Sequence, residues 1–379
     1  MNISACKACY QCGACYSICP HQAIRVDGES TFYRVVVDEE KCTDCGMCYD
    51  HCPANLELEG RKPVAAWGGW HRDRRVLLNS SSGGVFHGLA SAVLAQGGAV
   101  FGAVYADDNR CVMFASTDEV PLERMRKSKY VESLVGDSFR RIGQMLKQGR
   151  KVLFCGTPCQ CTGLRSYLGS KQEGLLTCDF ACGGLPSHQI YQQYLIGLER
   201  RFGAEIRSID FRPKTYGWRR YAVLVRFVNG RTYNRLGTED PYLRSFLYGK
   251  LTVRPECLDC KFSDCHQSDL TIADFWLNEK LSKLRNEEGI SLVLCNTEKG
   301  LEAIQAIRAD YCLEELDLEQ VSYNNKKTVT SPKDRERHDA FLALCSEEGM
   351  ERAFRKFFPV SWKTSLKNWL RRMKRRHNE

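Results

Sequence analysis

Two copies of one cysteine pattern near the N-terminus constrain the fold more strongly than any other feature of the sequence. The first copy has the spacing C-x2-C-x2-C-x3-C before Pro20, and it consists of Cys9, Cys12, Cys15 and Cys19. The second copy has the same spacing before Pro53, and it consists of Cys42, Cys45, Cys48 and Cys52. Three closely spaced thiolates on a tight loop can wrap one face of an iron–sulfur cubane, while a fourth from a distant segment ties the halves together. The N-terminal segment is therefore expected to fold around bound metal.

These cysteine sets resemble those of the two-cluster bacterial ferredoxins, in which the fourth cysteine of each run ligates the other cluster. The resemblance implies that one 4Fe-4S cluster is held by Cys9, Cys12, Cys15 and Cys52. It implies that the other is held by Cys42, Cys45, Cys48 and Cys19. Two zinc knuckles are the alternative, but zinc sites usually pair C-x2-C units across a longer loop. Short strands are expected between the runs, at residues 23–26 and 33–37.

Cysteine usage also bears on the cellular setting. The 379-residue chain has 21 cysteines, an odd number that fits poorly with a fully paired disulfide framework. Its hydrophobic fraction of 43% and charged fraction of 27% are ordinary for a globular protein. The first residues lack the charged and apolar regions of a secretory signal. Closely spaced thiols in a reducing compartment are more often metal ligands than disulfides, so a cytoplasmic location is expected.

Positive charge is concentrated at the C-terminus. Residues 351–379 contain ten Lys or Arg against two Glu, whereas the whole chain has a formal net charge of +9. Between Ser361 and Arg376, five apolar residues share one face of a predicted helix: Trp362, Leu366, Trp369, Leu370 and Met373. Such a basic helix can lie on the inner face of an anionic membrane, and docking onto the chain's own core is the alternative. No nucleic-acid partner is expected.

Helical and strand patterns alternate through the larger part of the chain, as in a mixed α/β domain. Helices are predicted over residues 81–98 and 135–149, each ending in glycine, with strands following at 99–107 and 151–156. Asn229-Gly230, between two strand patterns at 221–228 and 231–235, is a strong hairpin signal. Further core strands are predicted over residues 269–275 and 291–296.

Two turns in this region have the chemistry of binding sites. Ser80 to Gly84 precede a helix, where hydroxyls, glycine backbone and free amides suit a pyrophosphate, although serine is also a common N-cap. In the second turn, Thr157 suits the N-cap of a helix and Pro158 its first position. Cys159 then lies in the first turn, where helix-end amides favour a thiolate.

An ordered series of motifs resembles one known family. The motifs are SSSGGVF, RKSKYVES, GDSFR, VLFCGTPCQ, PYLRSFL, the C-x2-C of Cys257 and Cys260, and SDLTIADFW. In this order they are similar to the beta subunit of coenzyme F420-reducing hydrogenase and its dehydrogenase relatives, over roughly residues 65–360. Relatives with an N-terminal ferredoxin are flavoproteins that pass electrons between iron–sulfur clusters, FAD and a deazaflavin or another organic acceptor. Some bacterial members are linked to surface-polysaccharide genes.

The resemblance implies FAD and a third 4Fe-4S cluster in the large domain. The predicted ligands of this cluster are Cys159, Cys182, Cys257 and Cys260. Gly183 departs from the family, which more often has histidine after this second cysteine, and this weakens any role for that motif. Cys155 and Cys265 are close to the ligand segments and could take the place of a ligand.

The same resemblance suggests which residues contact the flavin. The predicted phosphate or ring contacts are Ser81, Ser82, Gly83, Gly84, Lys129, Tyr130, Gly156, Thr157 and Asp274. Asp274 could bind ribose or the flavin edge, and the alternative is a strand-ending cap. Arg212, Lys214 and Trp218 could bind an anionic substrate or form a solvated basic loop. No side chain is assigned as an acid–base catalyst.

These observations predict an α+β protein with four parts. They are a two-cluster ferredoxin module (1–60), a linker (61–75), a mixed α/β flavin and iron–sulfur domain (76–350) and a basic amphipathic tail (351–379). The predicted function is an iron–sulfur flavoprotein oxidoreductase that exchanges electrons with a redox partner protein or a small molecule. The alternative is a non-catalytic electron-transfer subunit that docks on a partner enzyme.

Overall fold

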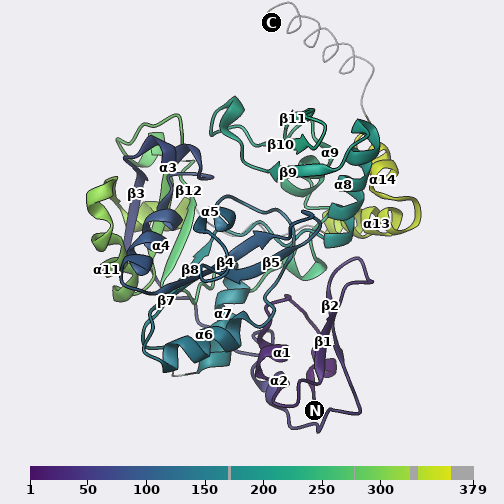
Figure 1. The fold of residues 1–379 in the computed structure, drawn as a ribbon, viewed down its shortest axis with the longest axis horizontal. Helices are drawn as coiled ribbons and strands as arrows, with labels where there is room; N and C mark the ends of the chain where they lie inside the picture. Colours follow the sequence, from purple (N-terminus) through teal and green to yellow (C-terminus); the bar gives the residue numbers. More distant parts are fainter. Residues whose placement is uncertain (170–171, 277, 325–331, 360–379) are drawn as a thin grey trace, which may run out of the picture.

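The computed structural model describes residues 1–169, 172–276, 278–324 and 332–359. Figure 1 shows a small N-terminal module at the bottom of the view, a broad central sheet with helices, and a smaller sheet above it. The predicted helix between Ser361 and Arg376 lies outside the described residues. Within the described ranges, no helix combines the length and apolar character needed to cross a membrane.

The N-terminal module has the two-fold repetition expected from its cysteine runs. Its elements are α1 (Ala14–Ile18), β1 (Ile24–Asp27), β2 (Arg34–Val37) and α2 (Met47–Asp50). Strands β1 and β2 pair antiparallel, with Ile24 opposite Val37, which confirms the two predicted strands. Gly13 and Gly46 cap the two short helices with φ of 87° and 82°, a left-handed conformation that glycine adopts without strain.

A nine-stranded mixed sheet forms the centre of the large domain. Its order is β14-β3-β13-β12-β8-β7-β4-β5-β6. The bounds are β3 (Ala65–His71), β4 (Ala99–Tyr105), β5 (Val112–Ser116), β6 (Ser133–Leu134), β7 (Val152–Cys155), β8 (Leu175–Phe180), β12 (Leu270–Asp274), β13 (Ser291–Cys295) and β14 (Tyr311–Leu316). Strands β4, β7, β8 and β12 are parallel to one another, whereas β13 is antiparallel to β12 and to β3.

Alternating side chains divide the sheet into two buried faces. Val100 and Leu153 point to the face covered by α4 (Val85–Ala95) and α11 (Glu298–Ala306). Their neighbours Phe101 and Phe154 point to the opposite face, under α6 (Ser138–Lys147) and α7 (Pro158–Leu168). This period of two is the geometry of a strand that is buried on both sides. The predicted helices and strands from 81 to 156 are thereby confirmed.

The segment predicted as a linker, residues 61–75, contains a central strand. Strand β3 pairs with β13 on one side and β14 on the other, and it is followed by α3 (Arg74–Leu78). The sequence AAWGGWH hides this strand because it has no polar alternation and includes two glycines, which are poor strand formers. Gly69 is required here, because a Cβ at this position would overlap the carbonyl oxygen of Cys312.

The smaller sheet has the order β11-β10-β9 and packs with three helices. Its elements are β9 (Ile206–Asp210), β10 (Ala222–Phe227) and β11 (Thr232–Leu236), with α8 (His188–Phe202), α13 (Pro332–Glu348) and α14 (Met350–Phe357). The β10–β11 pairing confirms the predicted hairpin around Asn229-Gly230. The remaining α-helices are short: α5 (Leu122–Met125), α9 (Pro241–Leu243), α10 (Asn278–Leu281) and α12 (Leu318–Asn324).

Buried polar contacts join the N-terminal module to the large domain. The Arg254 guanidinium, only 4% exposed, donates to the carbonyl oxygens of Cys9 at 3.1 Å and Tyr33 at 2.9 Å. Its charge is balanced by Glu132, which is fully buried at 2.9 Å and also accepts from His188 Nδ1 at 2.7 Å. This network fixes the position of the first cysteine run against the large domain.

Candidate iron–sulfur and cofactor sites

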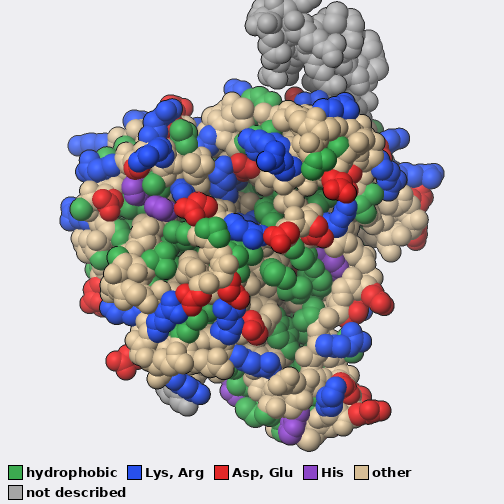
Figure 2. All heavy atoms as spheres, viewed as in Figure 1, with side chains coloured by type: hydrophobic (Ala, Val, Ile, Leu, Met, Phe, Trp, Pro, Cys, Tyr) green, Lys and Arg blue, Asp and Glu red, His purple; other side chains and the backbone are tan. Residues whose placement is uncertain are grey.

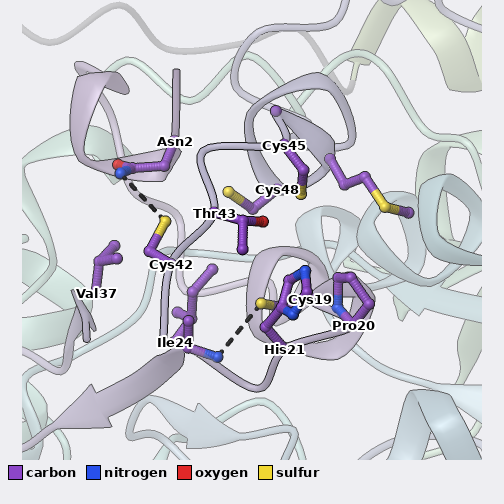
Figure 3. Close-up of a pocket in the computed structure, with 13 residues that line it drawn as sticks. Asn2, Cys19, Pro20, His21, Ile24, Val37, Cys42, Thr43, Cys45 and Cys48 are labelled. Carbon is purple, nitrogen blue, oxygen red and sulfur yellow. Dashed lines mark hydrogen bonds between the residues drawn. The ribbon is translucent and has the colours of Figure 1, made fainter. Parts of the chain in front are cut away.

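One N-terminal pocket gathers the cysteines that were assigned to a single cluster across the two runs. Its lining includes Cys19 together with Cys42, Cys45 and Cys48, as Figure 3 shows. The side chain of Asn2 donates to Cys42 Sγ at 3.6 Å, and the amide of Ala23 donates to Cys19 Sγ at 3.4 Å. Donors directed at sulfur stabilise ligating thiolates. The fold therefore brings the fourth cysteine of the first run to the first three of the second.

The complementary cysteines are Cys9, Cys12, Cys15 and Cys52, and they interact electrostatically with one another. Burial raises the pKa of Cys15, and the adjacent thiols of Cys9 and Cys52 raise it further. Burial also raises the pKa of Cys52, to about 12. Thiols that oppose one another's ionisation can all become thiolates only around a positively charged centre. These residues therefore have the electrostatics of an iron site.

The predicted ligands in the large domain line one cavity of about 580 Å³. Cys159, Cys182, Cys257 and Cys260 all belong to its lining. Cys155 and Cys265 are outside the set of described residues that line it. Its floor is the face of β12 and β13 that α6 and α7 leave uncovered, and it contributes Thr271, Ala273, Leu292, Leu294 and Asn296. The fold thus brings together cysteines from three separate segments.

Local structure explains how Cys159 reaches the cavity. Thr157 caps α7 with a complete capping box, and Pro158 begins the helix, as predicted. Cys159 follows in the first turn, and its Sγ lies 3.0 Å from Thr157 Oγ1. The helix terminus does not by itself make Cys159 a thiolate. Burial raises its pKa well above the usual value, and Cys182, Cys12 and Cys257 add to the shift.

The other cavity cysteines come from two loops. Cys182 follows β8, and Cys257 ends a short 3-10 helix, Pro255–Cys257. Gly184 allows these loops to approach, because a Cβ there would lie 2.8 Å from Val253 and 3.3 Å from the Cβ of Cys257. Burial raises the pKa of Cys182 to about 12. As in the N-terminal module, ionisation of these thiols requires a compensating cation.

The first cysteine run and the cavity cysteines are close neighbours. Cys12 and Cys159 pack in one apolar cluster, with Cys257 and Cys260 at its edge. The backbone of Gly163 in α7 is so close that an added Cβ would lie 3.3 Å from Cys12 Sγ. Tyr10, between two ligands of the first run, is part of the cavity lining. The N-terminal module therefore closes one side of the cavity.

The predicted phosphate-binding turn lies at the end of the same two floor strands. Gly83 N donates to Ser291 Oγ at 2.9 Å, and Ser82 Oγ donates to Ile290 O at 2.7 Å. Ser81 Oγ bonds Ser128 Oγ at 3.0 Å, and Gly84 caps α4 with φ of 88°. Both serine hydroxyls are therefore used to hold the turn against β13 and the KSKY segment. The glycine backbone is the part of the turn left for an anion.

Other predicted flavin contacts point into the protein. Lys129 Nζ donates to three backbone carbonyls, at 2.9 to 3.3 Å. Tyr130 packs against Phe211 and Phe246. Thr157 N is satisfied by Gln160 Oε1 at 3.0 Å, and a Cβ on Gly156 would meet Phe154 at 2.8 Å. These residues shape the surroundings of the site through packing.

Asp274 is held by the residues that were considered for an anionic substrate. Arg212 binds it through both guanidinium nitrogens, at 2.8 and 3.1 Å, and Trp218 Nε1 donates to it at 3.0 Å. Arg212 is 4% exposed, so this basic segment is buried and not a solvated loop. Lys214 Nζ donates to Leu77 O at 2.5 Å and Ser82 O at 3.0 Å. Burial, with the nearby charges of Arg212 and Lys127, lowers the pKa of Lys214 to about 7.

The cysteine sites suit a group larger than one ion. Throughout the described part of the chain, no three His, Cys, Asp or Glu side chains are close enough to hold a single metal ion. A 4Fe-4S cluster spaces four thiolates around a larger inorganic core. All-thiolate sets of four, one of them around a cavity, have the donor chemistry of such clusters.

Several cavity residues were not identified from the sequence. Arg61, Lys250 and Asp264 line the cavity and are exposed, so they mark its opening. His266 lines it as well, with Nδ1 against the buried Asp179. No spacing rule connects these residues, because they come from unrelated loops and strands. Figure 2 shows apolar side chains at the centre of one face of the molecule, with charged residues around them.

Comparisons with known proteins agree with the two halves of the structure. The family model for the C terminus of the coenzyme F420 hydrogenase/dehydrogenase beta subunit matches residues 149–321. A model of a 4Fe-4S dicluster domain matches residues 8–56. A chain in the F420-reducing NiFe hydrogenase complex from Methanosarcina barkeri is similar, with a TM-score of 0.48 and 16% identity over 77% of this chain and 95% of that chain. The comparison with curated proteins gives no match.

Proposed function

Because the chain belongs to the coenzyme F420 hydrogenase/dehydrogenase beta subunit family and carries a 4Fe-4S dicluster domain, we propose that it is an iron–sulfur flavoprotein oxidoreductase. In this proposal, electrons pass between the two N-terminal clusters, a third 4Fe-4S cluster, FAD and an organic donor or acceptor. The observation that carries it is the cavity in which Cys159, Cys182, Cys257 and Cys260 meet, beside the first cysteine run.

The positions of the cysteines support a linear order for the three clusters. The set of Cys19, Cys42, Cys45 and Cys48 is outermost, and Cys45 is exposed. The set of Cys9, Cys12, Cys15 and Cys52 lies between it and the cavity. Clusters supply one-electron transfer when bound, while the protein sets their spacing, burial and hydrogen bonds. A partner protein would meet the outer set, and the cavity would receive the small molecule.

The floor strands support flavin binding next to the third cluster. Ser291 and Asp274 are paired in the β12–β13 ladder, and they contact Gly83 and Arg212 respectively. Their neighbours along the strands, Leu292 and Ala273, line the cavity. A dinucleotide with its phosphates at the Ser81–Gly84 turn could therefore extend along these strands toward the cysteines. A cavity of about 580 Å³ is within the range of roughly 300–1,000 Å³ that organic ligands occupy.

Anaerobic purification with iron, acid-labile sulfide and flavin measured together tests the proposal. About twelve iron atoms are expected per chain from three four-iron clusters, with one FAD. About eight iron atoms and no flavin would contradict it and leave only the dicluster module.

A non-catalytic electron-transfer subunit is the second candidate, and the family's role as a beta subunit favours it. It predicts clusters that are reduced and reoxidised, with no turnover of a small acceptor until a partner enzyme is added. We further propose a cytoplasmic location with peripheral membrane contact through residues 361–379. Liposome sedimentation of the full chain and a chain ending at residue 360 tests this contact, and equal binding of both would contradict it.

A further inference from the structure

A histidine–aspartate pair is built into the cavity wall. His266 Nδ1 lies 3.0 and 2.9 Å from the two carboxylate oxygens of Asp179, which is fully buried. Asp179 Oδ1 also accepts from Thr271 Oγ1 at 2.6 Å, and this hydroxyl accepts from Asn296 Nδ2 at 3.0 Å. The orientation of the imidazole is therefore fixed by a chain of hydrogen bonds anchored on β8 and the floor strands.

This arrangement gives the two ring nitrogens different roles. Nδ1 donates to Asp179, so Nε2, on the other side of the ring, is the nitrogen left for the cavity that His266 lines. The His266 side chain is 18% exposed, so it can exchange protons with water. Burial disfavours the imidazolium, but the hydrogen bond and charge of Asp179, assisted by Asp264, raise the pKa of His266 overall. A carboxylate that orients a histidine in this way also stabilises its charged form.

The chemistry proposed for the cavity requires a proton as well as electrons. Iron–sulfur clusters deliver single electrons, whereas a flavin, deazaflavin or quinone takes up at least one proton with each electron pair. Apart from the proposed ligands, the titratable cavity residues are Tyr10, Arg61, Lys250, Asp264 and His266. Burial raises the pKa of Tyr10 to about 12, and Asp264 is exposed at the opening. Histidine is the residue type that exchanges protons near neutral pH.

We propose that His266, oriented by Asp179, is the proton donor and acceptor for a conjugated organic molecule that is reduced or oxidised in this cavity. The assignment rests on the proposed function. In the reducing direction, two electrons arrive singly from the reduced clusters, and the Nε2–H bond breaks as a heteroatom of the acceptor gains the proton. The product is the reduced monoanion, and the imidazole regains a proton from water. In the oxidising direction each transfer is reversed. Asp179 is a positioning residue.

Anaerobic holoprotein with bound FAD provides the test. In the His266→Gln variant, reduction of the flavin after mixing with dithionite is expected to slow at least tenfold, which is the lower side of the effect of a general acid. Bleaching of the clusters should keep its wild-type rate. Asp179→Asn is expected to slow flavin reduction less and to move its pH profile toward lower pH. His87→Gln, which changes a histidine on α4 outside the cavity, is the matched control.

The midpoint potential of the flavin provides a readout that does not depend on turnover. Plotted against pH, the wild-type potential should bend where His266 titrates, and the bend should disappear in His266→Gln but remain in His87→Gln. Unchanged rates and an unchanged bend in His266→Gln, in protein with full iron and flavin, would overturn the proton-transfer role alone. About eight iron atoms and no flavin in the wild type would overturn the proposed function and this assignment with it.

Discussion

The two cysteine-rich regions of this protein reach similar chemistry by opposite routes. In the N-terminal module every ligand set comes from two short runs, and each run starts a helix at a left-handed glycine. In the large domain the four cysteines come from a helix terminus and two loops. The first site is local, and its metal is part of the folding unit. The second depends on a nine-stranded sheet that would be built without it.

The regions also differ in exposure. Cys45 of the outer set is exposed, whereas Cys159 is 6% exposed and lies against the N-terminal module. An exposed cluster can exchange electrons with a partner protein, and a buried one is protected from water and shielded from other oxidants. The comparison teaches that the module and the cavity have different neighbours, which suits them to opposite ends of an electron path.

The strongest test of this comparison removes the ligands of one region at a time. The double variant Cys257→Ser, Cys260→Ser should lose about four iron atoms per chain, one cluster, and keep a folded large domain, because its sheet does not need the metal. Cys42→Ser with Cys45→Ser should instead unfold the N-terminal module, because a small metal domain folds with its metal. Iron analysis and circular dichroism measure both effects.

Cys312→Ser, on an edge strand of the large sheet, is the matched control and should keep all the iron. Equal iron loss in the control and in the Cys257, Cys260 variant would show that the cavity cysteines are ordinary core residues.

The second prediction concerns the buried ion pair that joins the two regions. Arg254→Gln leaves the fully buried Glu132 without its cation, and removing one partner of such a pair costs about 3–5 kcal/mol of unfolding free energy. Combining it with Glu132→Gln should recover part of the loss, since no unpaired charge then remains. Urea unfolding of the single and double variants measures the difference. A loss below about 1 kcal/mol in Arg254→Gln would show that the modules are held together by other contacts.

The sequence predicted local features well and assembled features poorly. The ferredoxin-like strands, the α7 cap and the β10–β11 hairpin were all predictable, because each depends on residues within a few positions of one another. Strand β3 was missed because AAWGGWH has neither alternation nor strong strand formers, and only pairing on both sides makes it a strand.

The same distinction holds for the candidate sites. The four cavity cysteines were proposed from family resemblance, and only the fold shows that they share a cavity. His266 and Asp179 could not have been paired, because their contact depends on the β8–β12 register, in which Asp179 lies opposite Thr271. Conversely, Ser82 and Lys129 looked available for a phosphate, but their polar atoms are used by backbone carbonyls.

A smaller effect is expected at the phosphate turn, which has no metal to organise it. A methyl group on Gly83 would overlap the carbonyl oxygen of Gly69 and come within 2.6 Å of Ser291 N. Gly83→Ala should therefore lower the unfolding free energy by about 1–3 kcal/mol, as overpacking does, and weaken flavin binding while leaving the iron content unchanged. Gly197→Ala in α8, where the added methyl meets open space, should be stabilising by up to about 1 kcal/mol. Equal stability of the two variants would contradict the tight fit of the turn.

The smallest predicted effect is a pH dependence that only the flavin side of the comparison should show. Lys214, with its pKa lowered to about 7, is largely neutral at pH 9 and donates to the carbonyl of Ser82 in the phosphate turn. A pyrophosphate bound there favours the ammonium form, so FAD binding should take up a proton above pH 7. Affinity should then fall as pH rises from 7 to 9, by at most about tenfold per pH unit for one proton.

Calorimetry of FAD binding to flavin-depleted protein, in buffers of different ionisation enthalpy, measures this proton uptake directly. Lys214→Met should abolish the uptake and flatten the affinity profile, while the absorbance of the clusters stays constant over the same pH range. Proton uptake that persists in Lys214→Met would assign it to another group. Binding that is independent of pH in the wild type would place the phosphates away from Lys214, and hence away from the turn formed by Ser81–Gly84.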